Sequence, residues 1–211
     1  RIGNRVFNNH ETSGRGMISF RKAIQISCDT VFYAVAYDSW RAQGGFAARS
    51  DARDPFVAVT TGLGLGARTG VDLPGEASGR IPDRAWKKAT WEATKADSCR
   101  RARTGYPEVA DRRQAAYLGQ VAVENCESGY LLRPGDAANF SIGQGDVAVT
   151  PLQMAVMYGA IANGGTVVTP RVGSSVVDPV TREGESVAAG PRRTAPLTAS
   201  VDAYLRAALR D

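Results

Sequence analysis

The spacing of apolar residues along the chain predicts a protein rich in α-helix and poor in β-strand. Between Ile18 and Trp40, apolar side chains recur every three or four positions in two separate runs, a period typical of helices with one buried face. The glycine pair at 44–45 ends the second run. Only Val167–Pro170 has the composition of a strand, and the mixture indicates an α+β protein. Helices are expected over residues 18–26, 30–40, 56–61, 83–103, 111–126, 152–162 and 198–209, a strand end within 1–9, and a surface loop over 178–191.

The segment from Leu152 to Ala162 carries the strongest local signals. Thr150 is a favourable N-cap, Pro151 occupies the first helical position, and Gln153 completes a capping box. The glycine pair at 164–165 predicts a left-handed end to this helix. Because the segment is apolar or small on every side, we expect the helix to be buried all round.

Length and composition are those of a folded globular protein. The chain has 211 residues, 43% of them hydrophobic and 22% charged, which suffices for one domain with a real core. No stretch reaches the ~18 consecutive apolar residues of a membrane span, and residues 1–9 do not resemble a signal peptide. Any membrane anchor is therefore expected outside this sequence.

The charge pattern argues against nucleic-acid binding. The net charge is +5, from 26 basic and 21 acidic residues. The basic residues are scattered, and none of them forms the aromatic-interleaved patch that binds single strands. The densest run, Arg84–Arg103, is interpreted as the solvated face of a helix.

Cysteine and histidine usage predicts neither a metal site nor a cofactor. The chain has three cysteines and one histidine, no C-x-x-C motif, and no partner for His10 at ligand spacing. Cys99 and Cys126 each lie at the end of an expected helix and form either a disulfide or two buried thiols. Cys28 is left over.

Ser27-Cys28-Asp29 lies between two helical patterns. On one continuous helix, residues two apart point about 200° from each other and cannot serve one cleft. A break between residues 27 and 30 lets Ser27 and Asp29 face the same pocket, with Asp29 or Thr30 as N-cap of the second helix. From spacing alone, the alternative is that Ser27 and Asp29 only cap helices.

Several blocks of this sequence resemble one protein family. Residues 142–145 (IGQG), 150–153 (TPLQ) and 162–165 (ANGG) resemble the corresponding block of class B penicillin-binding proteins, membrane-anchored D,D-transpeptidases of peptidoglycan synthesis. Residues 26–33 (ISCDTVFY) are similar to the second motif of the elongation-type members. The resemblance implies a penicillin-binding/serine β-lactamase-like transpeptidase fold.

The resemblance also implies roles for individual residues. Ser27 would relay a proton to the leaving D-alanine amine, and Asp29 would shape the cleft and position the stem peptide. Many relatives have Asn at the position of Asp29, and a carboxylate accepts hydrogen bonds but does not donate them. Gly143, Gln144 and Gly145 either bind substrate through close backbone approach or form a loop that supports the catalytic strand.

Two further matches are interpreted as decoys. Ser19-Phe20-Arg21-Lys22 fits the nucleophile motif S-x-x-K, but it precedes Ser27 by only eight residues, whereas the family separates the two motifs by several tens. Arg68-Thr69-Gly70 resembles K-T-G but lies upstream of the 150–153 block. Residues 1–211 are therefore expected to be the central part of a transpeptidase domain, with a helical insert over 83–135 and without the first and third motifs.

These resemblances predict part of a transpeptidase that cross-links stem peptides through an acyl-serine intermediate and is acylated by β-lactams. The isolated chain is predicted to be inactive. The alternatives are an inactive interaction module of the wall-synthesis machinery and a β-lactam-sensing relative. The implied partners are D-Ala-D-Ala stem peptides, β-lactams, glycosyltransferases and elongation-complex proteins. The implied location is the extracytoplasmic face of the plasma membrane.

Overall fold

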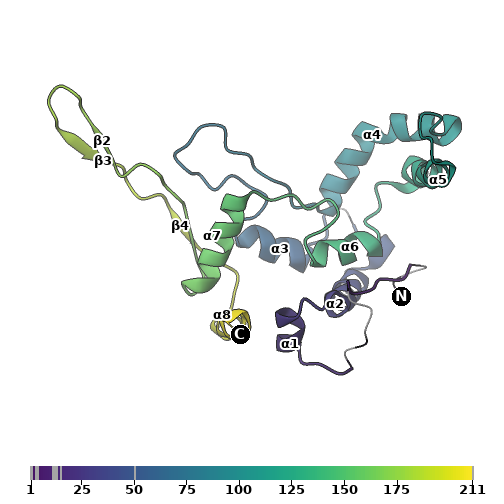
Figure 1. Cartoon of the computed structure of the whole chain (residues 1–211), viewed down its shortest axis with the longest axis horizontal. Helices are drawn as coiled ribbons and strands as arrows, with labels where there is room; N and C mark the ends of the chain where they lie inside the picture. The colour runs from purple at the N-terminus through teal and green to yellow at the C-terminus, as the bar shows by residue number, and fades with distance from the viewer. Residues whose placement is uncertain (1, 3–4, 11–13, 15, 50, 211) are drawn as a thin grey trace.

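The computed structural model describes residues 2, 5–10, 14, 16–49 and 51–210, and confirms the α+β class with helices predominating (Figure 1). The helices are α1 (Phe20–Gln25), α2 (Asp29–Ala42), the 3-10 turn η1 (Gly45–Ala47), α3 (Pro55–Gly62), α4 (Arg84–Thr104), α5 (Arg112–Ser128), α6 (Pro134–Ser141), α7 (Pro151–Ala162) and α8 (Ala199–Arg210). The strands are β1 (Thr166–Val168), β2 (Ser175–Val177), β3 (Gly184–Ser186) and β4 (Arg192–Thr194). Among the described residues, no helix combines the length and apolar character that crossing a membrane requires.

One core joins α2 to α6, a helix that the sequence analysis did not predict. Tyr33 and Ala138 are buried there against Ile2, and the rings of Phe7 and Tyr33 meet edge to face at 5.1 Å. At the other end of α2, Trp40 Nε1 donates a hydrogen bond of 2.9 Å to the carbonyl of Leu132. The two helices therefore run antiparallel and position the segments that follow each of them.

A second core forms where α7 packs on β1. Its buried members are Leu63, Val156, Ala160, Val167 and Ala195. Strand β1 pairs antiparallel with β4, so two short strands cover one side of α7.

The expectation that 152–162 is buried all round is wrong. Gln153, Val156, Ala160 and Ile161 are buried, but Tyr158 on another face is 51% exposed. The predicted cap geometry is confirmed, since Thr150 and Gln153 form both bonds of a capping box. A helix of this composition exposes one face here because the two-stranded sheet covers only the other.

The expected surface loop over 178–191 contains part of a β-hairpin instead. Strands β2 and β3 pair antiparallel, with Val176 opposite Glu185. Figure 1 shows this hairpin projecting away from the helices. Its valines are largely open to solvent, since Val176 and Val180 are 68% and 87% exposed. The low apolar content of the segment hid β3, a strand of only three residues, and β2 ends directly before the segment.

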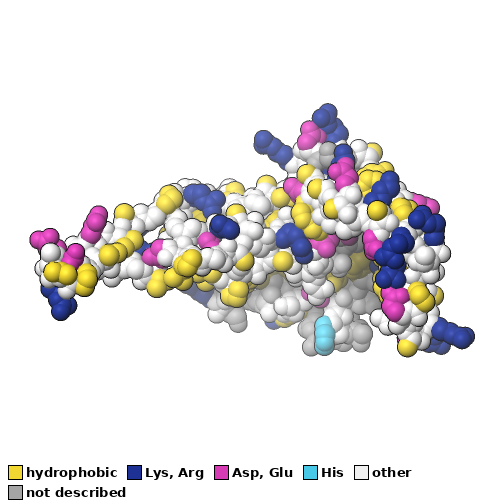
Figure 2. All heavy atoms as spheres, turned by 90° about the horizontal axis from the view of Figure 1, so that it is seen from above, with side chains coloured by type: hydrophobic (Ala, Val, Ile, Leu, Met, Phe, Trp, Pro, Cys, Tyr) yellow, Lys and Arg dark blue, Asp and Glu magenta, His cyan; other side chains and the backbone are white. Residues whose placement is uncertain are grey.

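Helices α4 and α5 form a hairpin closed by a disulfide between Cys99 and Cys126, which settles the alternative left open above. Lys and Arg side chains gather at this end of the molecule (Figure 2). Most of the α4 surface is exposed, as expected for a solvated face. Arg84 departs from that expectation, because it is buried, with only 7% of its surface exposed.

Candidate functional site

The first candidate site is the junction between α1 and α2, which carries Ser27. The predicted helix break is confirmed, since α1 ends at Gln25 and α2 begins at Asp29. Ser27 itself adopts a left-handed backbone with φ of +50°. For a residue with a Cβ this conformation costs about 1–3 kcal/mol and persists only where its surroundings impose it. Such strain is concentrated at functional sites, which is consistent with a functional role for this serine.

Neighbouring residues hold the junction in place. The buried Cys28 lies with its Sγ 3.6 Å from Asn9 Nδ2, and its backbone N–H donates to Ala23 O at 2.9 Å. Asn9 Oδ1 accepts a hydrogen bond of 2.9 Å from the backbone N–H of Thr30. The expectation that Asp29 or Thr30 is the N-cap of α2 is therefore wrong. Cys28 occupies that position, and Asn9, from 21 residues upstream, supplies the acceptor.

Ser27 and Asp29 differ in their surroundings. Ser27 is exposed, whereas Asp29 is half-buried in the first turn of α2. Burial raises the pKa of Tyr33, one turn further along, and the negative charge of Asp29 raises that pKa further. Asp29 thus projects toward the same side of α2 as Tyr33, and Ser27 remains open to solvent. That Ser27 and Asp29 face the same cleft remains a prediction.

The two decoys have structural roles. Ser19 is the N-cap of α1, and its Oγ accepts a hydrogen bond of 3.2 Å from the backbone N–H of Lys22. In the other match, Glu76 accepts hydrogen bonds from both the N–H and the hydroxyl of Thr69, each at 2.6 Å. These bonds, the hydroxyl first, lower the pKa of Glu76. The Arg68-Thr69-Gly70 segment is thus the closure of a loop.

A second carboxylate joins this loop to the chain beyond β1. Asp72 accepts hydrogen bonds from the backbone N–H groups of Val172 and Gly173, at 2.7 and 2.8 Å. These two bonds lower the pKa of Asp72. The loop after α3 is therefore tied to residues about 100 positions later in the sequence.

Gln153 completes the attachment of this loop. The sequence pattern predicted only a capping role for this residue and no contact with distant segments. It is completely buried, and its Nε2 donates to Ala67 O at 2.6 Å and to Ser78 O at 2.8 Å. Its Oε1 accepts from Thr150 N–H at 3.1 Å. A Cβ at Gly79 would lie 2.7 Å from that Oε1, so only glycine fits there. The sequence did contain a signal for these contacts, namely a polar residue within an otherwise apolar helix.

The turn formed by Gly143, Gln144 and Gly145 is tight. Both glycines have left-handed backbones, with φ of +71° and +73°. The N–H of Gln144 donates to Asn139 O at 2.9 Å, and a Cβ at Gly145 would lie 3.3 Å from Asn139 Cβ. The turn therefore folds back along α6.

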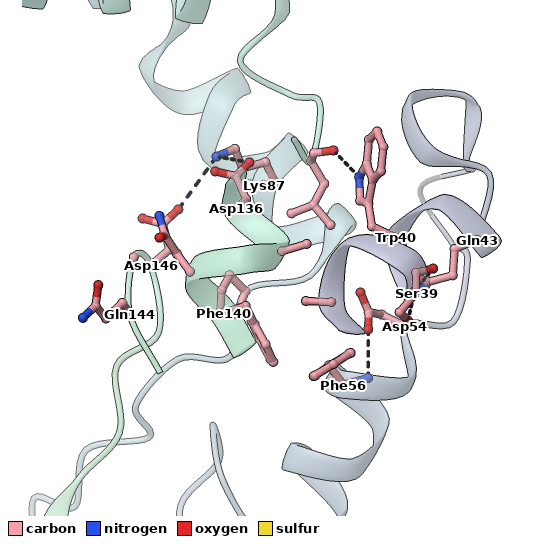
Figure 3. Close-up of a pocket in the computed structure, with 16 residues that line it drawn as sticks. Ser39, Trp40, Gln43, Asp54, Phe56, Lys87, Asp136, Phe140, Gln144 and Asp146 are labelled. Atoms are coloured by element: carbon pink, nitrogen blue, oxygen red, sulfur yellow. Dashed lines mark hydrogen bonds and ion pairs between the residues drawn. The ribbon is translucent and has the colours of Figure 1, made fainter. Parts of the chain in front are cut away.

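Gln144 and Gly145 line a cavity of about 90 Å³ between α2, the start of α3 and α6 (Figure 3). Its apolar wall contains Trp40, Phe56 and Phe140, which come from these three helices. The part of α2 that lines it starts at Ala36, about 10 Å along the helix from Asp29. The structure thus does not bring this cavity to Ser27, and a role of residues 143–145 in binding substrate remains a prediction.

An ion-pair bridge closes the other side of the cavity. Lys87 Nζ lies 3.1 Å from Asp136 Oδ2 and 3.8 Å from Asp146 Oδ2, so α4, α6 and the turn meet at one ammonium group (Figure 3). The Lys87 side chain is only 19% exposed, which strengthens the bridge relative to a surface pair. Within the described ranges, no group of three or more His, Cys, Asp or Glu residues is placed to hold a metal ion.

The sequence profile described as "Penicillin binding protein transpeptidase domain" matches residues 2–209. The chain belongs to this family. The peptidoglycan D,D-transpeptidase MrdA of Acinetobacter baumannii is 28% identical over 173 residues, which are 79% of this chain and 17% of that protein. MrdA of Haemophilus influenzae is 26% identical over 200 residues, or 95% of this chain and 23% of that protein. The chain thus spans about a fifth of the length of these transpeptidases.

Solved structures of penicillin-binding proteins share the fold. PBP2 of Pseudomonas aeruginosa in complex with WCK 5153 has a TM-score of 0.61 at 23% identity and covers 98% of this chain and 34% of its own. PBP2 of Helicobacter pylori has a TM-score of 0.59 at 24% identity and covers 100% and 28%. The expected membership of the penicillin-binding protein family and the transpeptidase fold are therefore confirmed.

Proposed function

We propose that this chain is the central part of the transpeptidase domain of a class B peptidoglycan D,D-transpeptidase. The observation that carries the proposal is the strained, exposed Ser27 at a helix junction, in a chain whose family match spans residues 2–209. The MrdA names of its relatives support the same reaction class. In this assignment, residues 83–135 are a helical insert.

The proposed reaction is acyl transfer through a serine ester. The serine of the S-x-x-K motif attacks the carbonyl of the penultimate D-alanine, the peptide C–N bond breaks, and the terminal D-alanine leaves as an amine. Ser27 relays the proton that the attacking serine loses to that amine, and Asp29 positions the stem peptide. The amine of a second stem then takes the acyl group and frees the serine. A β-lactam would form the same ester and trap the enzyme.

Three observations support the proposed setting. The disulfide between Cys99 and Cys126 is the kind of bond that persists outside the reducing cytosol, which supports an extracytoplasmic location. A structural neighbour of this chain is PBP2 of Helicobacter pylori in a complex with MreC, with a TM-score of 0.56. Another is part of a peptidoglycan synthase complex that coordinates polymerization and crosslinking. We infer elongation-complex and glycosyltransferase partners of the same kind, and D-Ala-D-Ala stems as substrate.

The test is acylation, by a fluorescent penicillin, of the full-length protein of which this chain is proposed to be the central part. Ser27→Ala should slow acylation about 10²-fold or more, the usual contribution of a positioned proton-transfer group. Ser19→Ala is the matched control, since it removes only a helix cap, and it should acylate at the parental rate. Equal rates for Ser27→Ala and Ser19→Ala would remove Ser27 from the mechanism.

The isolated 211-residue chain provides a second arm. It should form no covalent adduct, because neither decoy is a nucleophile. A penicillin adduct on Ser19 of this polypeptide would contradict the assignment of the motifs.

A further inference from the structure

The turn that joins α1 to α2 gives Ser27 a conformation for which glycine is the usual residue. The N–H of Cys28 donates to Ala23 O at 2.9 Å, and the N–H of Ser27 donates to Ile24 O at 3.3 Å. This pair of bonds is the Schellman motif, which commonly ends helices and usually has glycine at its left-handed position. Ser27 holds that position with a φ of +50°. The two bonds fix the backbone of Ser27 relative to α1, and neither of them reaches α2.

The contact with α2 is supplied by Asn9. Cys28, the N-cap of α2, makes no side-chain cap bond, so the first turn of α2 takes its acceptor from elsewhere. Asn9 Oδ1 accepts a hydrogen bond of 2.9 Å from the N–H of Thr30, at the second position of the helix. An N-cap side chain normally bonds to the second or third N–H of its own helix. Asn9 therefore takes the place of a local N-cap side chain, from 21 residues upstream.

The same asparagine also contacts the turn. Asn9 Nδ2 lies 3.6 Å from the Sγ of Cys28, which follows Ser27 directly and is buried. The hydroxyl of Thr30 lies 3.5 Å from that sulfur. One side chain thus holds both the residue after Ser27 and the first turn of α2.

Asn9 is itself held in place by a core. The chain before α1 passes beside α2 (Figure 1), where the rings of Phe7 and Tyr33 meet at 5.1 Å. Phe7 packs on the buried cluster that contains Tyr33 and Ala138. Asn9 lies two residues from this anchor and is half-buried. Because its backbone is restrained there, the hydrogen bond to Thr30 has less conformational entropy to offset.

We propose that Asn9 is a positioning residue for Ser27 in the transpeptidase reaction. It ties the turn to the first turn of α2, so the strained backbone that carries the Ser27 hydroxyl is held in one arrangement. Asn9 takes no part in the proton transfer itself. This inference rests on the proposed function, because the effect of Asn9 on acylation passes through Ser27.

The test is the rate at which a fluorescent penicillin acylates the full-length protein. Asn9→Ala removes the acceptor for Thr30 and should slow acylation about fivefold, the factor that one N-cap hydrogen bond represents. Asn9→Asp keeps the acceptor oxygen and should be acylated within about twofold of the unsubstituted rate. Asn8→Ala is the matched control, because Asn8 is the exposed neighbour of Asn9, and it should leave the rate unchanged.

A double-mutant cycle separates positioning from a general loss of folding. In a Ser27→Ala background, Asn9→Ala should cause no further slowing, because the group that Asn9 positions is gone. A general loss of folding would slow acylation by the same factor in both backgrounds. Hydrogen exchange of the full-length protein gives a second readout, since the amide of Thr30 should exchange faster in Asn9→Ala than in Asn9→Asp.

The possible failures are distinguishable. If Ser27→Ala is slow, the positioning role alone is overturned by an unchanged rate in Asn9→Ala, by equal slowing in both backgrounds, or by an Asn9→Asp variant as slow as Asn9→Ala. If Ser27→Ala is acylated at the unsubstituted rate, the proposed role of Ser27 fails, and that of Asn9 fails with it.

Discussion

Replacement of Gln153 by methionine tests how the loop after α3 is held to α7. Methionine keeps the length and helix propensity of glutamine but removes three side-chain hydrogen bonds, to Ala67 O, Ser78 O and Thr150 N–H. Each such bond contributes about 1 kcal/mol net, so the variant should lose about 3 kcal/mol of unfolding free energy. Because Gln153 is completely buried, water cannot easily reach the backbone groups that would lose their hydrogen-bond partner.

Urea denaturation followed by circular dichroism measures this change. For a protein of this size, 3 kcal/mol corresponds to a fall in Tm of roughly 6–12 °C. Gln120→Met is the matched control, because Gln120 is exposed on α5, and it should change stability by less than about 0.5 kcal/mol. Equal stability of the two variants would show that the three side-chain hydrogen bonds of Gln153 do not hold the loop to α7.

Hydrogen exchange locates the effect. The amide of Ala148 donates to Arg80 O at 2.9 Å, next to the segment that Gln153 holds. This amide should exchange faster in Gln153→Met than in the parent, while amides of α5 keep their protection. Uniformly faster exchange over the whole chain would indicate general destabilisation instead of loss of one attachment.

Three further outcomes follow from the structure. Replacing Cys99 and Cys126 together by alanine opens a loop of 27 residues and should lower the unfolding free energy by about 3.5 kcal/mol, measured by urea denaturation without reductant. Hydrogen bonds lower the pKa values of Asp72 and Glu76 in the folded protein. Both carboxylates therefore stabilise the fold at pH values above their unfolded-state pKa values. This contribution is lost as the pH falls through their lowered folded-state pKa values. Asp72→Asn with Glu76→Gln should therefore show a shallower loss of stability in an acid titration, and an unchanged slope would contradict this. Ser27→Gly relieves the strain of the φ of +50°, so it should leave the unfolding free energy unchanged or raise it by up to about 1 kcal/mol. In the full-length protein, the same variant should be acylated by penicillin more slowly than the unsubstituted protein. A clear loss of stability would show that the backbone of Ser27 is not strained.

Elements with strong local signals were predictable from the sequence. Helix α7 begins where Thr150, Pro151 and Gln153 predicted, because an N-cap, a proline at the first position and a capping box act within four residues. The helix break at Ser27 was also predicted, since residues 27–29 fall between two separate apolar patterns. Helix α6 was missed because Arg133 at its N-cap gives no conventional signal; its first turn depends on Asp136, which accepts the N–H of Arg133 at 2.9 Å.

What the sequence did not predict depends on contacts between distant segments. The acceptor that caps α2 comes from Asn9, and no local pattern connects it to Thr30. The side-chain bonds of Gln153 reach residues 75 and 86 positions away. Arg84 was assigned to a solvated face because its neighbours in sequence are charged, yet the folded chain leaves only 7% of it exposed.

The disulfide between α4 and α5 also determines what a protease would leave behind. The turn between the two helices is flanked by the exposed Arg103 and Arg112, both of which trypsin recognises. Because Cys99 and Cys126 lie on either side of that turn, a chain nicked there stays in one covalent piece. It would migrate intact on a denaturing gel and separate into two fragments only after reduction. The hairpin tip is thus a place where the backbone can be cut without releasing either half of the molecule.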